Sequence, residues 1–295
     1  MKVMKFGGTS VGSIEALRHV KNIVETCHEP VVVVVSAMSG VTNQLLELCD
    51  LATAGDGSWG TVLQAMEERH LTVAAEVVRP ELQEQCAATI RNFVERNLHP
   101  HLSMLMINKD LDTEARHRLR DVVVANGEIL SSAVVSGMLA DAVPHLSLHF
   151  ITTTSDDAGR IVDWPATERL VKQEFDRLDG IHVMQGFIAS DSQSHQVTNL
   201  GRGGSDYSAA IVAAVLQADA LEIWTDVDGF MTADPRTHAD ATVLPRMTYA
   251  QAQQMCDAGA RVIYPPTIAP VAQRNIPVWV KNTFNPDAPG TLIIG

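Results

Sequence analysis

The residues best suited to chemistry in this chain are cationic side chains and carboxylates that stand beside glycines. The chain opens with MKVMKFGGTS, in which Lys5 follows an apolar segment and precedes Gly7 and Gly8. Glycines let backbone N–H groups approach an anion, and the lysine supplies positive charge. The spacing matches neither a Walker A loop nor a dinucleotide fingerprint. The stretch is therefore compatible with a phosphate site of another kind or with a strand that ends in a tight turn.

A second glycine-rich stretch, LGRGGSDYSAA, occupies residues 200–210. Its glycines free the backbone, and Ser205 or Asp206 can cap the helix predicted to follow. The helix N-terminus would present free N–H groups to an anion, and Arg202 would add a guanidinium suited to carboxylate or phosphate. A purely structural cap needs neither three glycines nor an arginine. We interpret this stretch as an anion-binding loop.

Acidic residues follow an apolar run at residues 224–236, WTDVDGFMTADPR. In a calcium-loop frame that starts at Asp226, position 12 is Thr237 rather than glutamate, so a calcium site is not expected. Strand-end carboxylates beside glycine suit contact with a ribose or with the Mg²⁺-bound water of a nucleotide. An ordinary acidic turn is the alternative.

Two further polar stretches adjoin apolar runs. VANGEIL places Glu128 at an expected helix start, where it is either a first-turn acid or a ligand. SAMSGVTN places Ser36 and Thr42 just after five consecutive valines. Such a valine run is typical of a strand buried on both faces, and ligands of open α/β sheets bind where these strands end. Hydroxyls are also ordinary helix caps, so this signal alone does not decide.

The elements that must position these residues alternate between strand and helix. Apolar runs predict strands at 3–6, 31–35, within 148–157, within 181–191, and at 220–224, 278–281 and 291–294. Helical spacing predicts helices at 14–25, through 45–51, several within 60–122, and at 129–139, 166–178 and after residue 204. The T-x-x-Q pattern at 248–251 predicts a further helix start. This alternation predicts a largely parallel or mixed sheet covered by helices.

Composition limits the classes of function. The chain has 295 residues, of which 46% are hydrophobic, so a large core can form. Its net charge of −13 argues against a nucleic-acid or anionic-membrane partner. Four widely spaced cysteines argue against a disulfide framework or zinc site, and we expect no metal site. Because no signal peptide or apolar run of about 18 residues is present, we expect a cytoplasmic protein.

Together these stretches resemble the aspartate kinase family, within the amino-acid kinase superfamily. The stretches that carry the resemblance are KFGGTSV at 5–11, SAMSGVTN at 36–43, GE at 127–128, LGRGGSDYSAA at 200–210, WTDVDGFMTADPR at 224–236, GARVIYPPT at 259–267 and KNTFNPDAPGT at 281–291. They follow the family order over nearly the whole chain. The resemblance implies a three-layer αβα sandwich of the carbamate kinase-like type, with a mainly parallel central sheet. It also implies an N-terminal lobe over 1–200 for aspartate and phosphoryl transfer, and a C-terminal lobe over 201–295 for the nucleotide.

The reaction that the resemblance implies is ATP + L-aspartate → ADP + 4-phospho-L-aspartate, the first step toward lysine, threonine and methionine. The implied catalytic residues are Lys5 and Asp206. The residues implied to bind L-aspartate are Ser36, Thr42, Glu128, Arg202 and Ser205. Those implied to bind ATP are Lys5, Gly7, Gly8, Thr225, Asp226, Met231, Arg236 and Arg261, with Mg²⁺ carried by the nucleotide. Met231 and Arg261 depart from the family, which often has tyrosine and lysine at these positions, and arginine differs from lysine in reach and donor geometry.

The resemblance is strongest to the catalytic domain of a bifunctional aspartate kinase/homoserine dehydrogenase. In this family ACT regulatory domains normally follow at about the point where the sequence stops, so we expect a chain without them. Family dimer contacts lie largely in those domains, which leaves a homodimer open. The alternatives are another superfamily kinase, acting on glutamate, N-acetylglutamate or a nucleoside monophosphate, and a ligand-binding module without turnover. Glu128 with Arg202 favours a free amino acid, and the presence of Lys5 and Asp206 counts against a module without turnover.

Overall fold

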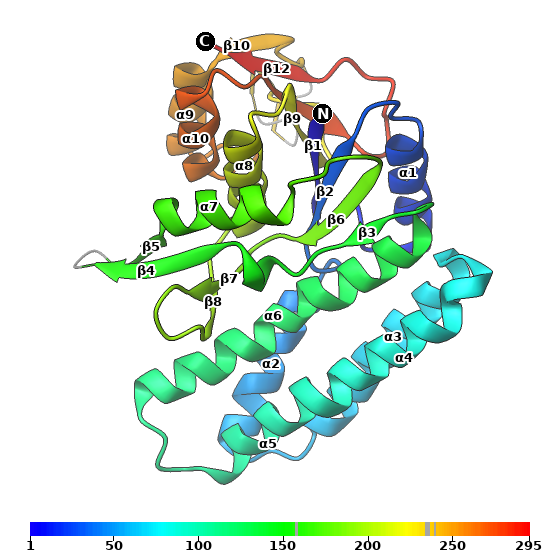
Figure 1. Ribbon diagram of the computed structural model, residues 1–295, viewed down its shortest axis with the longest axis vertical. Helices are drawn as coiled ribbons and strands as arrows, with labels where there is room; N and C mark the ends of the chain where they lie inside the picture. Colours follow the sequence, from blue (N-terminus) through cyan, green and yellow to red (C-terminus); the bar gives the residue numbers. More distant parts are fainter. Residues whose placement is uncertain (157–158, 234–236, 239) are drawn as a thin grey trace.

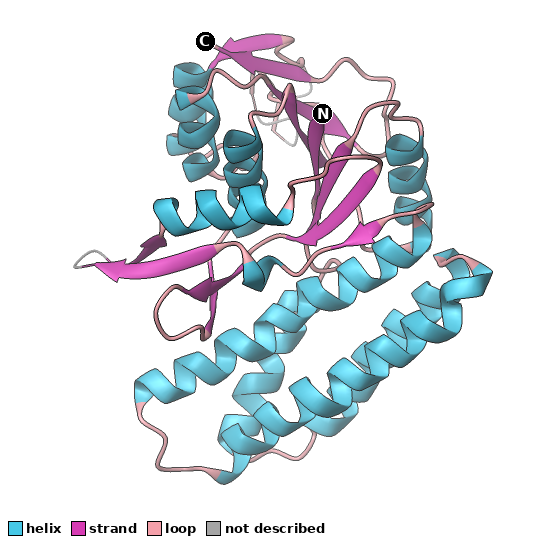
Figure 2. Cartoon of the chain, viewed as in Figure 1, coloured by secondary structure: helices cyan, strands magenta, loops and turns pink. Residues whose placement is uncertain are grey.

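A computed structural model describes residues 1–156, 159–233, 237–238 and 240–295 of the chain (Figures 1 and 2). The strands of its large sheet are β1 (Lys2–Phe6), β2 (Val31–Val35), β3 (Val143–Pro144), β6 (Ile181–Gln185), β9 (Ala220–Thr225), β10 (Arg246–Thr248), β11 (Val278–Asn282) and β12 (Thr291–Ile294). Their order is β10-β12-β11-β9-β1-β2-β6-β3. Among these pairs only β11 and β12 run antiparallel. The mainly parallel central sheet is thereby confirmed.

A smaller sheet stands beside the large one, with the order β5-β4-β7-β8. It contains β4 (Thr152–Asp156), β5 (Gly159–Val162), β7 (Ile188–Asp191) and β8 (Val197–Asn199). The expectation of one strand within residues 181–191 is wrong, because β6 and β7 belong to different sheets. The chain bends between them at Gly186 and Phe187, where Phe187 adopts a φ of 65°. A Cβ on Gly186 would lie 2.5 Å from the Cβ of Ser205, so close packing against the second glycine-rich stretch accompanies the bend.

Helices cover both faces of the large sheet (Figure 2). They are α1 (Ile14–Glu25), α2 (Val41–Ala54), α3 (Trp59–Val77), α4 (Gln83–Phe93), α5 (His99–Ile107), α6 (Thr113–Met138), α7 (Trp164–Glu174), α8 (Gly204–Leu216), α9 (Tyr249–Asp257) and α10 (Ile268–Gln273). The helices expected within 60–122 are confirmed, and so is the capping box at the start of α9. None of the helices in these described ranges is long and apolar enough to cross a membrane.

Alternate residues of the central strands enter two separate cores. Met4 and Phe6 of β1 pack with α1–α6, whereas Val3 of the same strand packs with α7–α10. The valines of β2 divide in the same way, since Val33 joins the first core and Val34 the second. A strand buried on both faces requires this continuous apolar run. The three-layer αβα arrangement predicted for the chain is confirmed.

Helix α6 differs from expectation because it continues through the Asn-Gly pair that was expected to precede a helix start. It is one helix of 26 residues, and Glu128 lies within it rather than in a first turn. The amide of Asn126 donates to the carbonyl of Val122 at 2.7 Å, which accommodates this polar residue inside the helix. A Cβ on Gly127 would lie 2.9 Å from that of Ala37, so the glycine permits α6 to approach the loop after β2.

The carboxyl ends of β1, β2, β9 and β11 meet at one edge of the large sheet because these strands are parallel. Residues that follow the strands are consequently neighbours there, although they come from distant parts of the sequence. Strands from the ranges 1–200 and 201–295 share this sheet. The division of the chain into two lobes at residue 201 stays a prediction.

Candidate active site

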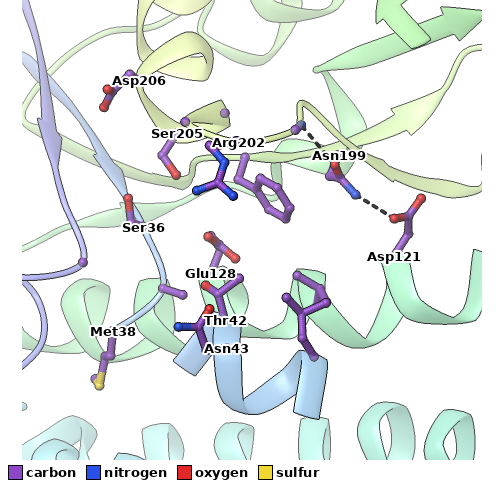
Figure 3. Close-up of a pocket in the computed structure, with 18 of the residues that line it drawn as sticks. Ser36, Met38, Thr42, Asn43, Asp121, Glu128, Asn199, Arg202, Ser205 and Asp206 are labelled. Carbon is purple, nitrogen blue, oxygen red and sulfur yellow. Dashed lines mark hydrogen bonds between the residues drawn. The ribbon is translucent and has the colours of Figure 1, made fainter. Parts of the chain in front are cut away.

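A cavity of about 600 Å³ opens at this edge, between α2, α6 and the glycine-rich loop before α8 (Figure 3). It is lined by all of the residues that the sequence predicted for catalysis or amino-acid binding: Lys5, Ser36, Thr42, Glu128, Arg202, Ser205 and Asp206. Gly8 lines it as well. The parallel strands thus bring together residues that lie up to about 200 positions apart in sequence.

An ion pair between Lys5 and Asp206 forms one wall of the cavity. The Nζ of Lys5 lies 2.7 Å from Oδ1 of Asp206, and both side chains are about nine-tenths buried. The other carboxylate oxygen, Oδ2, accepts the backbone N–H of Tyr264 at 3.2 Å. Because Asp206 is held on both oxygens, it fixes the position of the lysine ammonium. An ammonium has three N–H donors, so Lys5 keeps donors for a further anion.

The two glycines of the turn after β1 differ in whether their N–H group is available to a ligand. The N–H of Gly7 already donates to the carbonyl of Trp224 at 3.1 Å. The N–H of Gly8 has no acceptor among the described residues, while its carbonyl accepts the N–H of Ser39 at 3.0 Å. A Cβ on Gly8 would lie 3.0 Å from the carbonyl oxygen of Ala37. Of the two glycines named in the sequence, only Gly8 offers its N–H to a phosphoryl oxygen in this structure.

Glu128 presents a buried carboxyl group to the cavity. Its side chain is directed inward from α6 in Figure 3, and the residue is 4% exposed. Burial raises the pKa of this carboxyl to about 8, against smaller opposing effects from backbone N–H groups and from the charge of Lys5. Its Oε2 has no hydrogen-bond partner in the described part of the chain. A buried, unpartnered carboxyl oxygen is costly, so this atom is suited to a cationic ligand group.

Arg202 faces the same cavity from the opposite side. Its guanidinium points into the space above Glu128 in Figure 3 and makes no ion pair or hydrogen bond within the described ranges. The flanking Gly201 and Gly203 have φ values of 74° and 70°, which favour glycine. A Cβ on Gly203 would also lie 2.5 Å from the Cβ of Tyr264. The cavity therefore carries a cationic group and an ionisable acid on facing walls.

The capping expected from Ser205 or Asp206 is wrong. The N-cap of α8 is Gly203, and both of these residues lie in the first turn of the helix. This placement directs Asp206 to Lys5 and leaves Ser205 on the cavity wall. The positive end of the helix dipole still faces the cavity.

The residues predicted to bind the nucleotide lie mostly outside this cavity. Thr225 ends β9, its hydroxyl donates to Oδ1 of Asp226 at 3.2 Å, and Asp226 is exposed. Met231 forms an isolated bridge with Val243, and Arg261 is exposed. Arg236 lies outside the described residues. Because β9 pairs with β1, Thr225 follows the strand next to Lys5, but the nucleotide contacts themselves stay a prediction.

Several cavity residues were not anticipated from the sequence: Asn43, His117, Arg120, Asp121, Phe187 and Asn199. Asp121 precedes Glu128 by about two helical turns on α6. If α6 had been expected to be continuous, that spacing would have predicted that Asp121 and Glu128 share one helix face. Asn199 carried no signal, because its role depends on contact with a distant helix. Asp228 was also missed as a structural residue, since its Oδ1 accepts the side-chain amide of Asn282 at 2.8 Å.

The amino acid kinase family model matches residues 1–282. Among curated proteins, the chain is similar to bifunctional aspartokinase/homoserine dehydrogenase 2 of Zea mays, with 34% identity over 298 residues, covering 99% of this chain and 32% of that protein. It is also similar to aspartokinase 1 of Arabidopsis thaliana, with 33% identity over 308 residues, covering 99% of this chain and 51% of that protein. The chain thus spans about a third of the first relative and half of the second.

Solved structures agree with this similarity. Aspartokinase III of E. coli, in complex with aspartate and ADP, superposes with a TM-score of 0.87 at 30% identity and covers all of this chain and 64% of that one. The aspartate kinase of Clostridium acetobutylicum superposes with a TM-score of 0.79 at 23% identity, over all of this chain and 62% of that one, and supports the fold alone. Because the family model extends over nearly the whole sequence, and the structure has the expected three layers, this chain belongs to the amino acid kinase family.

Proposed function

We propose that this chain is an aspartate kinase, which transfers the γ-phosphoryl group of ATP to the β-carboxylate of L-aspartate. The observation that carries the proposal is the position of Glu128 and Arg202 on facing walls of a cavity that Lys5 also lines. An α-amino acid carries one ammonium and one carboxylate on the same carbon, which matches these two groups. The aspartate and ADP named for the E. coli relative support L-aspartate and ATP as the substrates.

In this proposal Glu128 accepts the α-ammonium and Arg202 binds the α-carboxylate through its planar guanidinium. The substrate side chain is then directed toward Lys5. The hydroxyls of Ser36, Thr42 and Ser205 lie on the cavity wall and complete the binding site for the amino acid. The requirement for an ammonium disfavours an N-acetylated substrate, since such a compound would leave Oε2 of Glu128 without a partner.

The chemical step is a displacement at the γ-phosphorus. A β-carboxylate oxygen of aspartate forms a bond to this phosphorus, while its bond to the bridging oxygen of ADP breaks and ADP leaves with that electron pair. Such transfers depend on positioning and charge stabilisation more than on covalent participation of the protein. Lys5 neutralises charge on the phosphoryl oxygens, Asp206 keeps the lysine in place, and the N–H of Gly8 donates to one phosphoryl oxygen.

The nucleotide is proposed to lie along the ends of β9 and β11, next to Gly8. Thr225 and Asp226 would contact it, Met231 would supply an apolar surface, and Arg236 and Arg261 would bind phosphate oxygens. The strand order supports this placement, because β9 lies between β1 and β11. Mg²⁺ would enter with ATP and neutralise part of the phosphate charge.

Release of ADP from Mg-ATP tests this function with a panel of acceptors. L-aspartate should support turnover, whereas L-glutamate, N-acetyl-L-aspartate and succinate should each have kcat/KM values lower by about 100-fold or more, because L-glutamate misplaces the acceptor carboxylate and the other two lose the contact with Glu128. L-glutamate keeps both α-groups and tests side-chain length. The other two compounds lack the α-ammonium and test Glu128. Equal turnover with succinate and L-aspartate would contradict the proposed role of Glu128.

A further inference from the structure

The two groups that would hold the amino acid belong to elements that are distant in the sequence. Glu128 lies on α6, and Arg202 lies on the loop that joins β8 to α8. Glycines flank Arg202 on both sides, so the loop has little intrinsic preference for one conformation. Contacts between this loop and α6 therefore help to set the distance between the two anchors.

A side-chain hydrogen bond joins α6 to the end of β8, where this loop begins. The amide nitrogen of Asn199 donates to Oδ1 of Asp121 at 2.7 Å, as the dashed line in Figure 3 shows. Within the described ranges it is the hydrogen bond that connects α6 with the stretch from Asn199, the last residue of β8, to Gly204, the first residue of α8. Asp121 lies on the same side of α6 as Glu128, about two turns earlier.

The amide of Asn199 has partners of opposite polarity, which fix its orientation. Its Oδ1 accepts the backbone N–H of Gly201 at 3.0 Å, so its NH₂ group must face the carboxylate of Asp121. Gly201 is the residue immediately before Arg202. The chain of contacts thus runs from α6 through Asp121 and Asn199 to the backbone that carries the arginine. The other oxygen of Asp121 is paired with the exposed Arg160 at 3.0 Å.

We propose that Asp121 and Asn199 form a positioning clasp, which sets the location of Arg202 relative to Glu128 and thereby the affinity for the amino-acid substrate. This inference rests on the proposed function. In that proposed function, neither Asp121 nor Asn199 touches the reacting atoms. Both act through Arg202, so the clasp affects the binding of the amino acid and leaves the binding of ATP unchanged.

The variant Asn199→Asp tests the clasp because it replaces the side-chain NH₂ group with an oxygen and hardly changes the side-chain volume. It retains an oxygen that accepts the N–H of Gly201 but sets a carboxylate against that of Asp121. The repulsion should displace the loop and raise KM for L-aspartate by about tenfold or more, with KM for ATP within about twofold of wild type.

The reciprocal variant Asp121→Asn/Asn199→Asp restores a donor and an acceptor with their positions exchanged. It should return KM for L-aspartate to within about threefold of wild type, which loss of fold alone would not allow. Glu114→Gln is the matched control, because this exposed carboxylate is on the same helix and pairs with Arg118 rather than with the loop. The control should leave both KM values unchanged. Thermal melting of every variant shows whether the fold is retained.

Calorimetric titration of L-aspartate into each variant gives a readout that does not depend on turnover. A wild-type chain that binds L-aspartate but releases no ADP would contradict the proposed function. The titrations would still test the clasp, because they compare the affinity of each variant for L-aspartate with that of wild type. The clasp is wrong if Asn199→Asp binds L-aspartate as wild type does, or if KM for ATP rises equally. It is also wrong if the reciprocal variant is folded but remains as weak as Asn199→Asp. A wild-type chain that binds no L-aspartate overturns both inferences.

Discussion

At the scale of single residues, Lys5 and Asp206 depend on each other. Each is a buried charge, and each would be left without its counter-ion if the other were removed. Loss of one partner of a buried pair typically costs about 3–5 kcal/mol, whereas neutralising both costs much less. Catalysis and stability can therefore be separated at this pair, because the proposed role in phosphoryl transfer requires the lysine charge itself.

Lys5→Met should lower kcat by about 1,000-fold or more, because the cation that stabilises the transferred phosphoryl group is lost. Its melting temperature should fall by several degrees, since Asp206 stays buried and loses its partner. Lys5→Met/Asp206→Asn should recover most of the melting temperature and none of the turnover. Steady-state kinetics and calorimetric melting provide the two readouts. Turnover of Lys5→Met within tenfold of wild type would refute the assigned role.

Glu128 makes substrate binding dependent on pH. Its pKa is raised from 4.5 to about 8, so the free protein is largely protonated at this residue at pH 7. An ammonium binds the ionised carboxylate, so kcat/KM for L-aspartate should rise as pH increases toward about 8 and then level off. A flat profile between pH 6 and pH 9 for L-aspartate, measured under conditions where the protein remains folded, would argue against this role.

The same carboxyl should reduce stability as it ionises. Because its folded-state pKa lies above the unfolded value, the folded state binds more protons, and stability falls as pH rises from about 4.5 to about 8. Glu128→Gln lacks this ionisation, so it should be more stable than wild type at pH 8, by an amount on the order of a few kcal/mol, while its KM for L-aspartate rises by about 100-fold. Chemical denaturation at pH 5 and pH 8 measures the difference. A variant that is less stable than wild type at pH 8 would contradict this account.

At the scale of elements, α6 shows why part of the site could not be predicted. Asn-Gly is a common turn signal, and it led to a predicted helix start at Glu128. The structure has a continuous helix there, and Gly127 lets α6 approach the loop after β2 more closely than any larger residue would allow. That constraint arises from a segment about ninety positions earlier in the sequence, and no local pattern reports it.

Gly127→Ala provides the test at this scale. Alanine has the higher helix propensity by about 1 kcal/mol, but its Cβ would meet that of Ala37 at 2.9 Å. We therefore expect a lower melting temperature and a raised KM for L-aspartate, since Glu128 is the next residue. Gly60→Ala is the matched control, because Gly60 is also helical and its added Cβ meets nothing within 4 Å. The control should be neutral or stabilising, and equal effects of the two substitutions would contradict the close-packing argument.

At the scale of the whole molecule, the sequence predicted the features that depend on local patterns. The valine run of β2, the helical spacing of α1 and the capping box of α9 each specify their own element. The three-layer order and the seven residues that meet in the cavity were implied by the resemblance of the motifs to aspartate kinases, and the common edge of the parallel strands explains why residues that follow different strands meet there. The clasp between Asp121 and Asn199 could not be predicted, because the two residues lie 78 positions apart and meet only through packing.

The arrangement of the glycine turn also depended on the complete fold. Gly7 and Gly8 are equivalent in the sequence as donors to an anion. In the structure β9 lies beside β1, and the carbonyl of Trp224 accepts a hydrogen bond from the N–H of Gly7. A backbone donor can be assigned to a ligand only when the neighbouring strand is known.

The most direct test of the central claim is to trap the product. Incubation with Mg-ATP, L-aspartate and hydroxylamine should yield β-aspartyl hydroxamate in proportion to the ADP released, because hydroxylamine captures an acyl phosphate. Mass spectrometry with fragmentation distinguishes the β-hydroxamate from its α-isomer. The β-isomer would support both the acceptor and the orientation set by Glu128 and Arg202. ADP release without hydroxamate, or with the α-isomer, would contradict the account.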